Sequence, residues 1–205
     1  IMGAVNTLQW FEGGWKGYNT DGYGLQRALE TVFDIELQNC SVLILGAGGA
    51  ARAAAARCLA KGCTQVCITN RSADRLAALI SDLRAHFPES DLRGFPLDDL
   101  PQQVLNISNL IVINATSLGL QPEDPPPIDL SFLKLGSETR IYDMIYNPPQ
   151  TALLKDAEAE EMNRSNGLSM LVFQALRSLE IWSGREVSAE AMFEGAKKGM
   201  REIAL

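Results

Sequence analysis

The clearest chemical pattern in the chain is a glycine-rich turn after an apolar run. Gly46-Ala47-Gly48-Gly49-Ala50-Ala51 fits the GxGxxA form of the dinucleotide-binding fingerprint. Its first glycine allows a tight turn, its second lets the backbone approach a pyrophosphate, and the final alanine permits close packing of helix on sheet. A helix that begins here offers free N–H groups and a positive dipole end to phosphates. Since an apolar strand precedes the turn and a second strand follows the helix, we predict a dinucleotide site.

The end of the next predicted strand indicates which dinucleotide binds. NAD sites carry Asp or Glu about 20 residues beyond the motif, where the carboxylate binds the ribose hydroxyls. This chain has Asn70-Arg71 there, and no carboxylate before Asp74. An acid would repel the 2′-phosphate of NADP, whereas Asn70, Arg71 and Arg75 offer neutral and cationic donors. The sequence predicts NADP; the alternative is that Arg71 is a solvated residue at a helix start.

Further polar residues interrupt apolar segments. Asn6-Thr7 lies within a strand pattern, and Gln174 lies within a largely apolar helical segment. Thr116-Ser117 follows a predicted buried strand, and ligands of doubly wound sheets bind at the carboxyl ends of strands, so this loop should border the cofactor. The segment 19–22 is equally suited to a plain turn and helix cap, and its residues alone leave that choice open.

Taken together, these segments resemble the shikimate dehydrogenases and their quinate-using relatives. The resemblance spans nearly the whole chain, with the segments in the family's order. The matching strings are GAVNT at 3–7, GYNTDG at 17–22, GAGGA at 46–50, NRS at 70–72, NATS at 114–117, YDMIYNP at 142–148, GLSML at 167–171 with Gln174, and WSG at 182–184.

The resemblance implies an oxidoreductase of the shikimate pathway of aromatic amino-acid biosynthesis. Its reaction is reversible hydride transfer between shikimate and 3-dehydroshikimate, with NADP and without a metal. Asn6 and Asp21 are implied to bond the substrate hydroxyls, with Thr20 beside them and Gln174 reaching the substrate from the other side. Asp21 also belongs to the catalytic pair, and Tyr146 is implied to lie near the substrate.

The resemblance also assigns cofactor contacts outside the glycine-rich turn. Gly167 and Met170 are implied to lie near the nicotinamide. Asn70, Arg71 and Arg75 are implied to hold the 2′-phosphate.

The family's acid–base lysine pairs with the aspartate and lies upstream of the GAVNT string. This sequence begins at that string, and Lys16, its only early lysine, does not match the family's position. We therefore expect a fragment that binds NADPH but turns over shikimate poorly or not at all. The alternatives are quinate or a related cyclic polyol acid as the substrate, and a module that binds NADP without catalysis.

Hydrophobic periodicity predicts the elements that position these residues. Two extended runs around Glu12-Gly13-Gly14 predict a β-hairpin over 4–18, with Trp10 and Trp15 packed across it. A helical period follows from Thr20, the predicted N-cap. The predicted buried face of that helix is Leu25, Leu29, Val32 and Phe33.

Strands alternating with helices predict a doubly wound parallel sheet, the Rossmann-like α/β class. The chain is predicted to be helical after Tyr146, and the proline-rich segment 122–127 is predicted to be a loop. The expected strands are 42–45, 65–69, 110–113 and 140–145. The expected helices are an alanine-rich one after the glycine-rich turn that ends at about Ala60, one capped by Ser72, 150–162, 168–183 and 188–203.

These elements suggest three regions. Residues 1–19 would be a hairpin remnant of an α/β substrate domain, and 20–167 a linker helix with the NADP-binding domain. Residues 168–205 would be helices that return toward the substrate domain. Apolar surface on the hairpin and final helices would favour a homodimer or aggregation.

Composition is that of a globular protein, with 46% hydrophobic and 21% charged residues. A net charge of −7 argues against nucleic-acid or anionic membrane partners, and no apolar run is long enough to cross a bilayer. Four cysteines without a CxxC pair and a single histidine make a zinc site improbable. The cysteines are expected to be small buried hydrophobes in a reducing cytoplasm.

Overall fold

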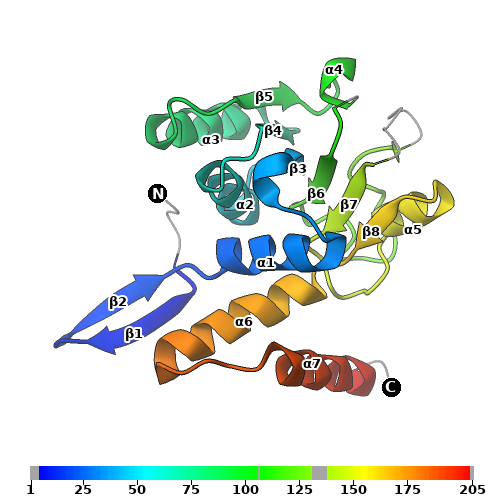
Figure 1. Ribbon diagram of the computed structural model, residues 1–205. Coiled ribbons are helices and arrows are strands. Elements are labelled where there is room, and N and C mark those ends of the chain that lie inside the picture. The colour runs from blue at the N-terminus through cyan, green and yellow to red at the C-terminus, as the bar shows by residue number, and fades with distance from the viewer. Residues whose placement is uncertain (1–4, 106, 131–137, 204–205) are drawn as a thin grey trace.

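The structure is a computed structural model that describes residues 5–105, 107–130 and 138–203 (Figure 1). Its centre is a six-stranded sheet in the order β5-β4-β3-β6-β7-β8, with every neighbouring pair parallel. This order is that of doubly wound nucleotide-binding folds, so the predicted fold class is confirmed. The strands are β3 (Ser41–Leu45), β4 (Gln65–Asn70), β5 (Leu92–Pro96), β6 (Leu110–Asn114), β7 (Arg140–Asp143) and β8 (Asn163–Ser165).

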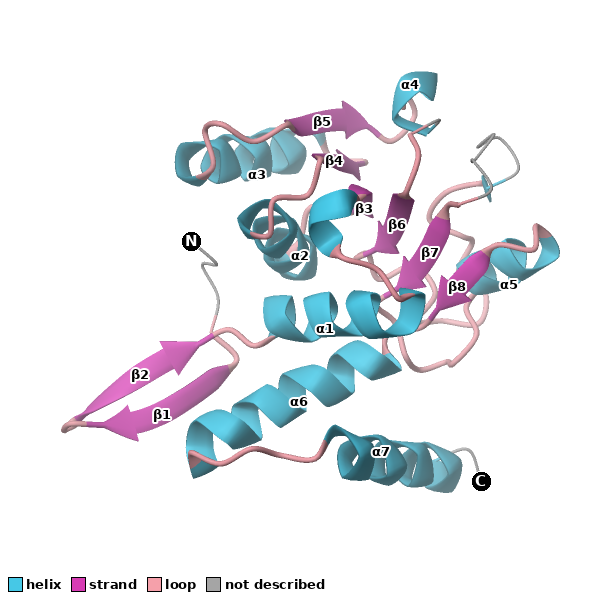
Figure 2. Cartoon of the chain, viewed as in Figure 1, coloured by secondary structure: helices cyan, strands magenta, loops and turns pink. Residues whose placement is uncertain are grey.

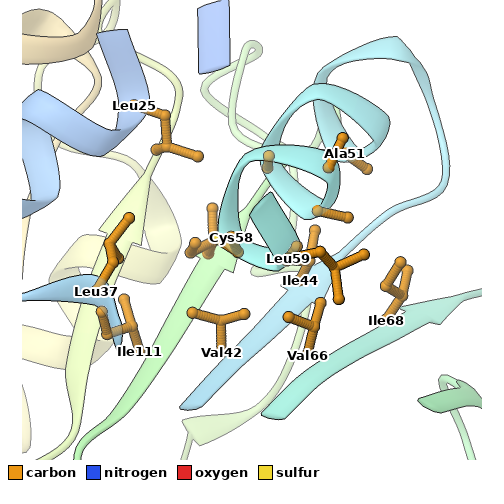
Figure 3. Close-up of a cluster of buried hydrophobic side chains, with 14 of the residues drawn as sticks. Leu25, Leu37, Val42, Ile44, Ala51, Cys58, Leu59, Val66, Ile68 and Ile111 are labelled. Atoms are coloured by element: carbon orange, nitrogen blue, oxygen red, sulfur yellow. The ribbon is translucent and has the colours of Figure 1, made fainter. Parts of the chain in front are cut away.

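Helices cover both faces of the sheet because its central strand is apolar on both sides. Val42 and Ile44 pack into the core formed with α1, α2 and α3 (Figure 3), and Leu43 and Leu45 pack into the core formed with α4 and α5. A continuous apolar run is the pattern expected for a strand buried on both faces. The helices are α1 (Asp21–Phe33), the short η1 (Leu37–Asn39), α2 (Gly49–Ala60), α3 (Ala73–His86), α4 (Gln102–Leu105), α5 (Ala152–Ala159), α6 (Leu168–Ser183) and α7 (Ala189–Ile203).

The predicted hairpin is present as β1 (Thr7–Phe11) and β2 (Gly14–Tyr18), which project from the rest of the molecule (Figure 2). Glu12 and Gly13 have φ values of 49° and 81°, as a two-residue type I′ turn requires, so Gly14 belongs to the strand instead. Trp10 and Trp15 pair as predicted, with ring centroids 5.2 Å apart. The first four residues of the chain lie outside the described residues.

Several predictions of local structure are wrong. The prediction of helix from Tyr146 onward is wrong at β8. This strand has three polar residues at a sheet edge and therefore lacks the apolar pattern that would predict it. Edge strand β5 was likewise unpredicted. Val32 is 38% exposed rather than on the buried face of α1. Thr20 is the N-cap residue of α1, as predicted, although its side chain makes no capping bond; Asn19 Oδ1 accepts from the Asp21 N–H.

None of the helices in the described ranges is long and apolar enough to cross a membrane.

Candidate functional site

The glycine-rich turn lies where β3 passes into α2. Gly46 has a φ of +111°, a conformation that side-chain-bearing residues avoid, and its N–H donates to the Thr69 carbonyl at 2.8 Å. A Cβ there would lie 3.0 Å from the Ala115 carbonyl oxygen. Glycine is therefore required both by backbone conformation and by the close approach of the loop after β6.

A groove of about 260 Å³ opens at this edge of the sheet. Its lining includes most of the predicted cofactor residues: Gly46, Ala47, Gly48, Asn70, Arg71, Arg75, Thr116 and Ser117. Gly49 and Ala50 are exposed in the first turn of α2 and do not line it.

The groove has the features that a dinucleotide needs. A Cβ on Gly48 would meet no atom within 4 Å, so glycine keeps open the space in front of the α2 N-terminus, whose first N–H groups have no partner within the helix. Thr69 Oγ1, at the groove wall, is buried and has no hydrogen-bond partner in the described part of the chain. An orphaned hydroxyl and exposed helix N–H groups fit a polar ligand at this position.

Two arginines flank the groove beyond the end of β4. Ser72 caps α3 by accepting from the Arg75 N–H at 3.4 Å, as predicted, and Asn70 Nδ2 donates to the Ser72 carbonyl at 3.0 Å. Arg71 and Arg75 are exposed, and neither side chain hydrogen-bonds or forms an ion pair within residues 5–105, 107–130 and 138–200. Their guanidinium groups are therefore available to an anionic ligand.

The loop after β6 is shaped by a buried amide. Asn114 Oδ1 accepts from both the N–H and the hydroxyl of Thr116, and Asn114 Nδ2 donates to Asp143 Oδ1 at 3.0 Å. Burial raises the pKa of the fully covered Asp143 carboxyl, which also accepts from Thr151 Oγ1 at 2.6 Å. Sequence reasoning did not single out Asp143; its signal is an acidic residue that ends an apolar buried strand.

A second hollow of about 460 Å³ lies between the hairpin, α1 and α6, and four predicted substrate residues line it: Asn6, Thr20, Asp21 and Gln174. Asn6 Nδ2 donates to Asp21 Oδ1 at 2.7 Å and to Thr20 Oγ1 at 3.0 Å, which fixes the carboxylate against the hairpin.

Ser178, which sequence reasoning missed, also lines this second hollow, and its hydroxyl lies 2.7 Å from that of Thr7. Its signal was its position one helical turn after Gln174. Tyr146 follows β7, is 38% exposed and does not line this hollow.

Family models match much of the chain. The model described as shikimate / quinate 5-dehydrogenase matches residues 27–119, and the shikimate 5′-dehydrogenase C-terminal domain matches 167–192. The shikimate dehydrogenase (NADP(+)) of Citrifermentans bemidjiense is 40% identical over 90% of this chain and 63% of its own length. That of Methanopyrus kandleri is 34% identical over 98% of this chain and 69% of its own.

The chain belongs to the shikimate/quinate 5-dehydrogenase family. It spans 63–69% of the length of the curated relatives it matches. Among solved structures, the ligand-free 5-ketofructose reductase of Gluconobacter sp. strain CHM43 is 36% identical with a TM-score of 0.81, covering 96% of this chain and 69% of that one.

Two residues that the family resemblance placed at the nicotinamide line neither hollow. Gly167 precedes α6 and donates its N–H to the Ile145 carbonyl at 3.1 Å. Met170 lies in the first turn of α6 and packs against the core formed with α1, α2 and α3. A cofactor contact by either residue stays a prediction.

In this family member, the second hollow lies beside a close contact between helices α1 and α6. A Cβ on Gly24 of α1 would lie 2.8 Å from the Met170 carbonyl oxygen and 2.9 Å from Gln174 Cβ. The absence of a side chain at Gly24 therefore allows α6 to approach α1 closely at Gln174.

We expect Gly24→Ala to lower the free energy of unfolding by about 1–3 kcal/mol, the usual cost of overpacking, despite alanine's better helix propensity. Urea unfolding measures this. The control is Gly195→Ala in α7, where a Cβ meets nothing within 4 Å and stability should rise by up to about 1 kcal/mol. Equal effects of the two substitutions would contradict the close contact.

Proposed function

We propose that this chain is the cofactor-binding part of an NADP-dependent dehydrogenase that interconverts shikimate and 3-dehydroshikimate. The observation that carries the proposal is the end of β4. There, among the residues that the structure describes, two arginines without a side-chain partner border the groove and no carboxylate lines it. A cationic edge favours a 2′-phosphate, and an acidic residue would repel it. The named relatives are shikimate dehydrogenases that use NADP(+), which supports both the cofactor and the reaction.

We assign the cofactor to the first hollow and the substrate to the second. The first holds the cofactor: the α2 N-terminus binds the pyrophosphate, Arg71 and Arg75 bind the 2′-phosphate, and Thr116 and Ser117 border the remainder. When bound, NADP accepts or supplies the hydride. In the second, Asn6 and Gln174 hold the substrate hydroxyls, and Asp21, held by Asn6, orients the reacting alcohol and its acid–base partner.

The proposed regions follow from this division. Residues 5–19 belong to the substrate side, 20–167 to the cofactor domain with its linker helix, and α6 returns toward the hairpin, while α7 packs on α6. Two bonds support that return: Gln9 Nε2 donates to the Ile181 carbonyl and Trp182 Nε1 donates to the Leu8 carbonyl.

Fluorescence titration with NADPH and NADH, followed by an assay with shikimate and NADP, tests the proposal. We expect NADPH to bind more tightly than NADH, with little or no turnover by this chain, because Lys16 does not line the second hollow. Equal affinity for both cofactors would contradict the assignment of the 2′-phosphate site. Rapid turnover would require an acid–base residue other than the family's lysine.

We expect Arg71→Ala to weaken NADPH binding about 10- to 100-fold and to leave NADH binding unchanged, since a charge-assisted hydrogen bond to phosphate contributes about 1.5–3 kcal/mol. Isothermal titration calorimetry measures both affinities. Arg185→Ala, at an exposed position after α6, is the matched control. An equal loss for both cofactors would place Arg71 away from the 2′-phosphate.

Quinate is the second candidate substrate, because the matching family model covers shikimate and quinate enzymes alike. One structural neighbour is named a 5-ketofructose reductase rather than a shikimate dehydrogenase, which supports testing a second substrate. Competition of shikimate and quinate for the second hollow, measured by NMR line broadening, distinguishes the two. A third candidate, a module that binds NADP without catalysis, predicts that neither acid binds.

We also propose that the hairpin face mediates self-association. Trp10, Trp15 and Phe11 are 60%, 68% and 53% exposed, and Trp182 beside them is 57% exposed, so the surface is unusually apolar. We expect a homodimer or larger species in multi-angle light scattering, and a shift toward monomer in Trp15→Lys. A concentration-independent monomer would contradict the proposal.

A further inference from the structure

Three of the four cysteines gather at the end of α2 that faces away from the cofactor groove. Cys40 directly precedes β3, Cys58 lies in the last turns of α2, and Cys63 lies just before β4. The Thr64 N–H donates to the Cys40 carbonyl at 2.9 Å, which ties these segments together. Figure 3 shows Cys58 pointing into the core beneath α2.

The backbone after α2 brings two of these thiols together. Gly62 has a φ of +73°, its N–H donates to the Leu59 carbonyl at 3.0 Å, and the Cys63 N–H donates to the Cys58 carbonyl at 3.1 Å. This pair of bonds is a Schellman motif, in which the residues at its two ends commonly make an apolar side-chain contact. Here both of those residues are cysteines, and Cys63 packs against the core cluster that contains Cys58.

The two sulfurs differ in environment. Cys58 is fully buried; its hydrogen bond to Cys63 and its burial raise its pKa well above the usual value, so it keeps its proton. Cys63 is half-buried, and the hydrogen bond from Cys58 lowers its pKa. Thiolates, not thiols, are the nucleophiles. The pair therefore combines an accessible nucleophilic sulfur with a protonated neighbour in contact.

We propose that Cys63 is an oxidation site for hydroperoxides and that Cys58 is its resolving thiol. The Cys63 thiolate attacks the terminal peroxide oxygen, the O–O bond breaks, and hydroxide leaves from hydrogen peroxide or alkoxide from an organic hydroperoxide, which produces a sulfenic acid. The Cys58 sulfur then displaces the sulfenic oxygen, which departs as water with the Cys58 proton, and an S–S bond forms. Two thiols are oxidised, one hydroperoxide is reduced, and the site is independent of the proposed dehydrogenase function.

The other cysteines are less suited to either role. Cys40 is buried, and its thiol donates to the Glu36 carbonyl at 3.5 Å. Cys67 lies in the core on the opposite face of the sheet, where burial raises its pKa to about 12. No cluster of three or more His, Cys, Asp or Glu residues within the described ranges has the geometry of a metal site, so the cysteines do not form one.

Peptide mapping of the intact chain after treatment with hydrogen peroxide tests the site. Trypsin cleaves after Arg57 and Lys61, so Cys58 and Cys63 fall on separate peptides, 58–61 and 62–71. We expect these peptides to be joined, with a loss of two hydrogens. Cys67 shares the second peptide, so Cys67→Ser is the matched control and should leave the cross-link intact.

Cys58→Ser should trap the sulfenic acid on Cys63, detected as a dimedone adduct, and Cys63→Ser should abolish both products. Iodoacetamide should alkylate Cys63 at least about tenfold faster than Cys67, because thiolate population sets the rate. Equal alkylation rates, a cross-link through Cys40, or peroxide treatment that leaves peptides 58–61 and 62–71 separate would each overturn the proposal. Circular dichroism of every variant checks that the fold is intact.

Discussion

Gly167→Ala is expected to lower the free energy of unfolding by at least about 4 kcal/mol, or to yield a chain that does not fold. A Cβ at this position would lie 2.0 Å from the Met144 carbonyl oxygen and 2.5 Å from its carbonyl carbon. Overpacking costs about 1–3 kcal/mol where side chains can move aside, and here the obstacle is backbone on a loop tied to β7. Relief requires α6 to shift away from the sheet.

Gly184→Ala is the control for this substitution. Gly184 ends α6 with a φ of +66°, and a Cβ there meets nothing within 4 Å. Only backbone strain of about 1–2 kcal/mol should result. Chemical denaturation with a constant slope measures both variants. If Gly167→Ala cost no more than Gly184→Ala, the close approach of α6 to the loop after β7 would be wrong.

The second large effect is expected at Asp143. Its carboxylate accepts from Asn114 Nδ2, the Ile145 N–H and Thr151 Oγ1, all buried. Asp143→Ala removes the acceptor and leaves these donors unpaired, at about 1–3 kcal/mol each. We expect a loss of at least about 3 kcal/mol in urea unfolding, together with weaker NADPH binding, because Asn114 also shapes the loop at Thr116.

Asp143→Asn keeps the shape of the side chain and removes the charge of the carboxylate. The amide keeps an acceptor for Ile145 and can donate to Thr151 Oγ1, so its loss should be only about 1 kcal/mol. Burial raises the folded pKa of Asp143 above its unfolded value, so its contribution to stability is full below the unfolded pKa and declines as pH rises through the folded pKa. The wild type should therefore lose stability relative to Asp143→Asn as pH rises. A pH-independent difference would contradict the raised pKa.

Elements with a strong local pattern could be predicted from the sequence. Strand β3 is apolar throughout because it is buried on both faces, and the hairpin turn needs positive φ at adjacent residues, which Gly13 favours. Strands β5 and β8 could not be predicted in this way. They lie at the two edges of the sheet, where pairing with β4 and β7 supplies the order that their own residues lack.

The cofactor turn was determined by the sequence itself, because its requirements are local. The φ of Gly46, the open space at Gly48 and the start of α2 all fall within four consecutive residues. The proposed preference for NADP likewise rests on Asn70 and Arg71, adjacent residues at the end of a single strand.

Only the tertiary structure determines which residues from distant segments of the chain lie together. Asn6, Asp21 and Gln174 line one hollow only because α1 and α6, which are far apart in sequence, pack closely at Gly24. Asn114 and Asp143 are joined because β6 and β7 pair in register. Spacing in a sequence does not encode such contacts; the packing of buried apolar faces creates them.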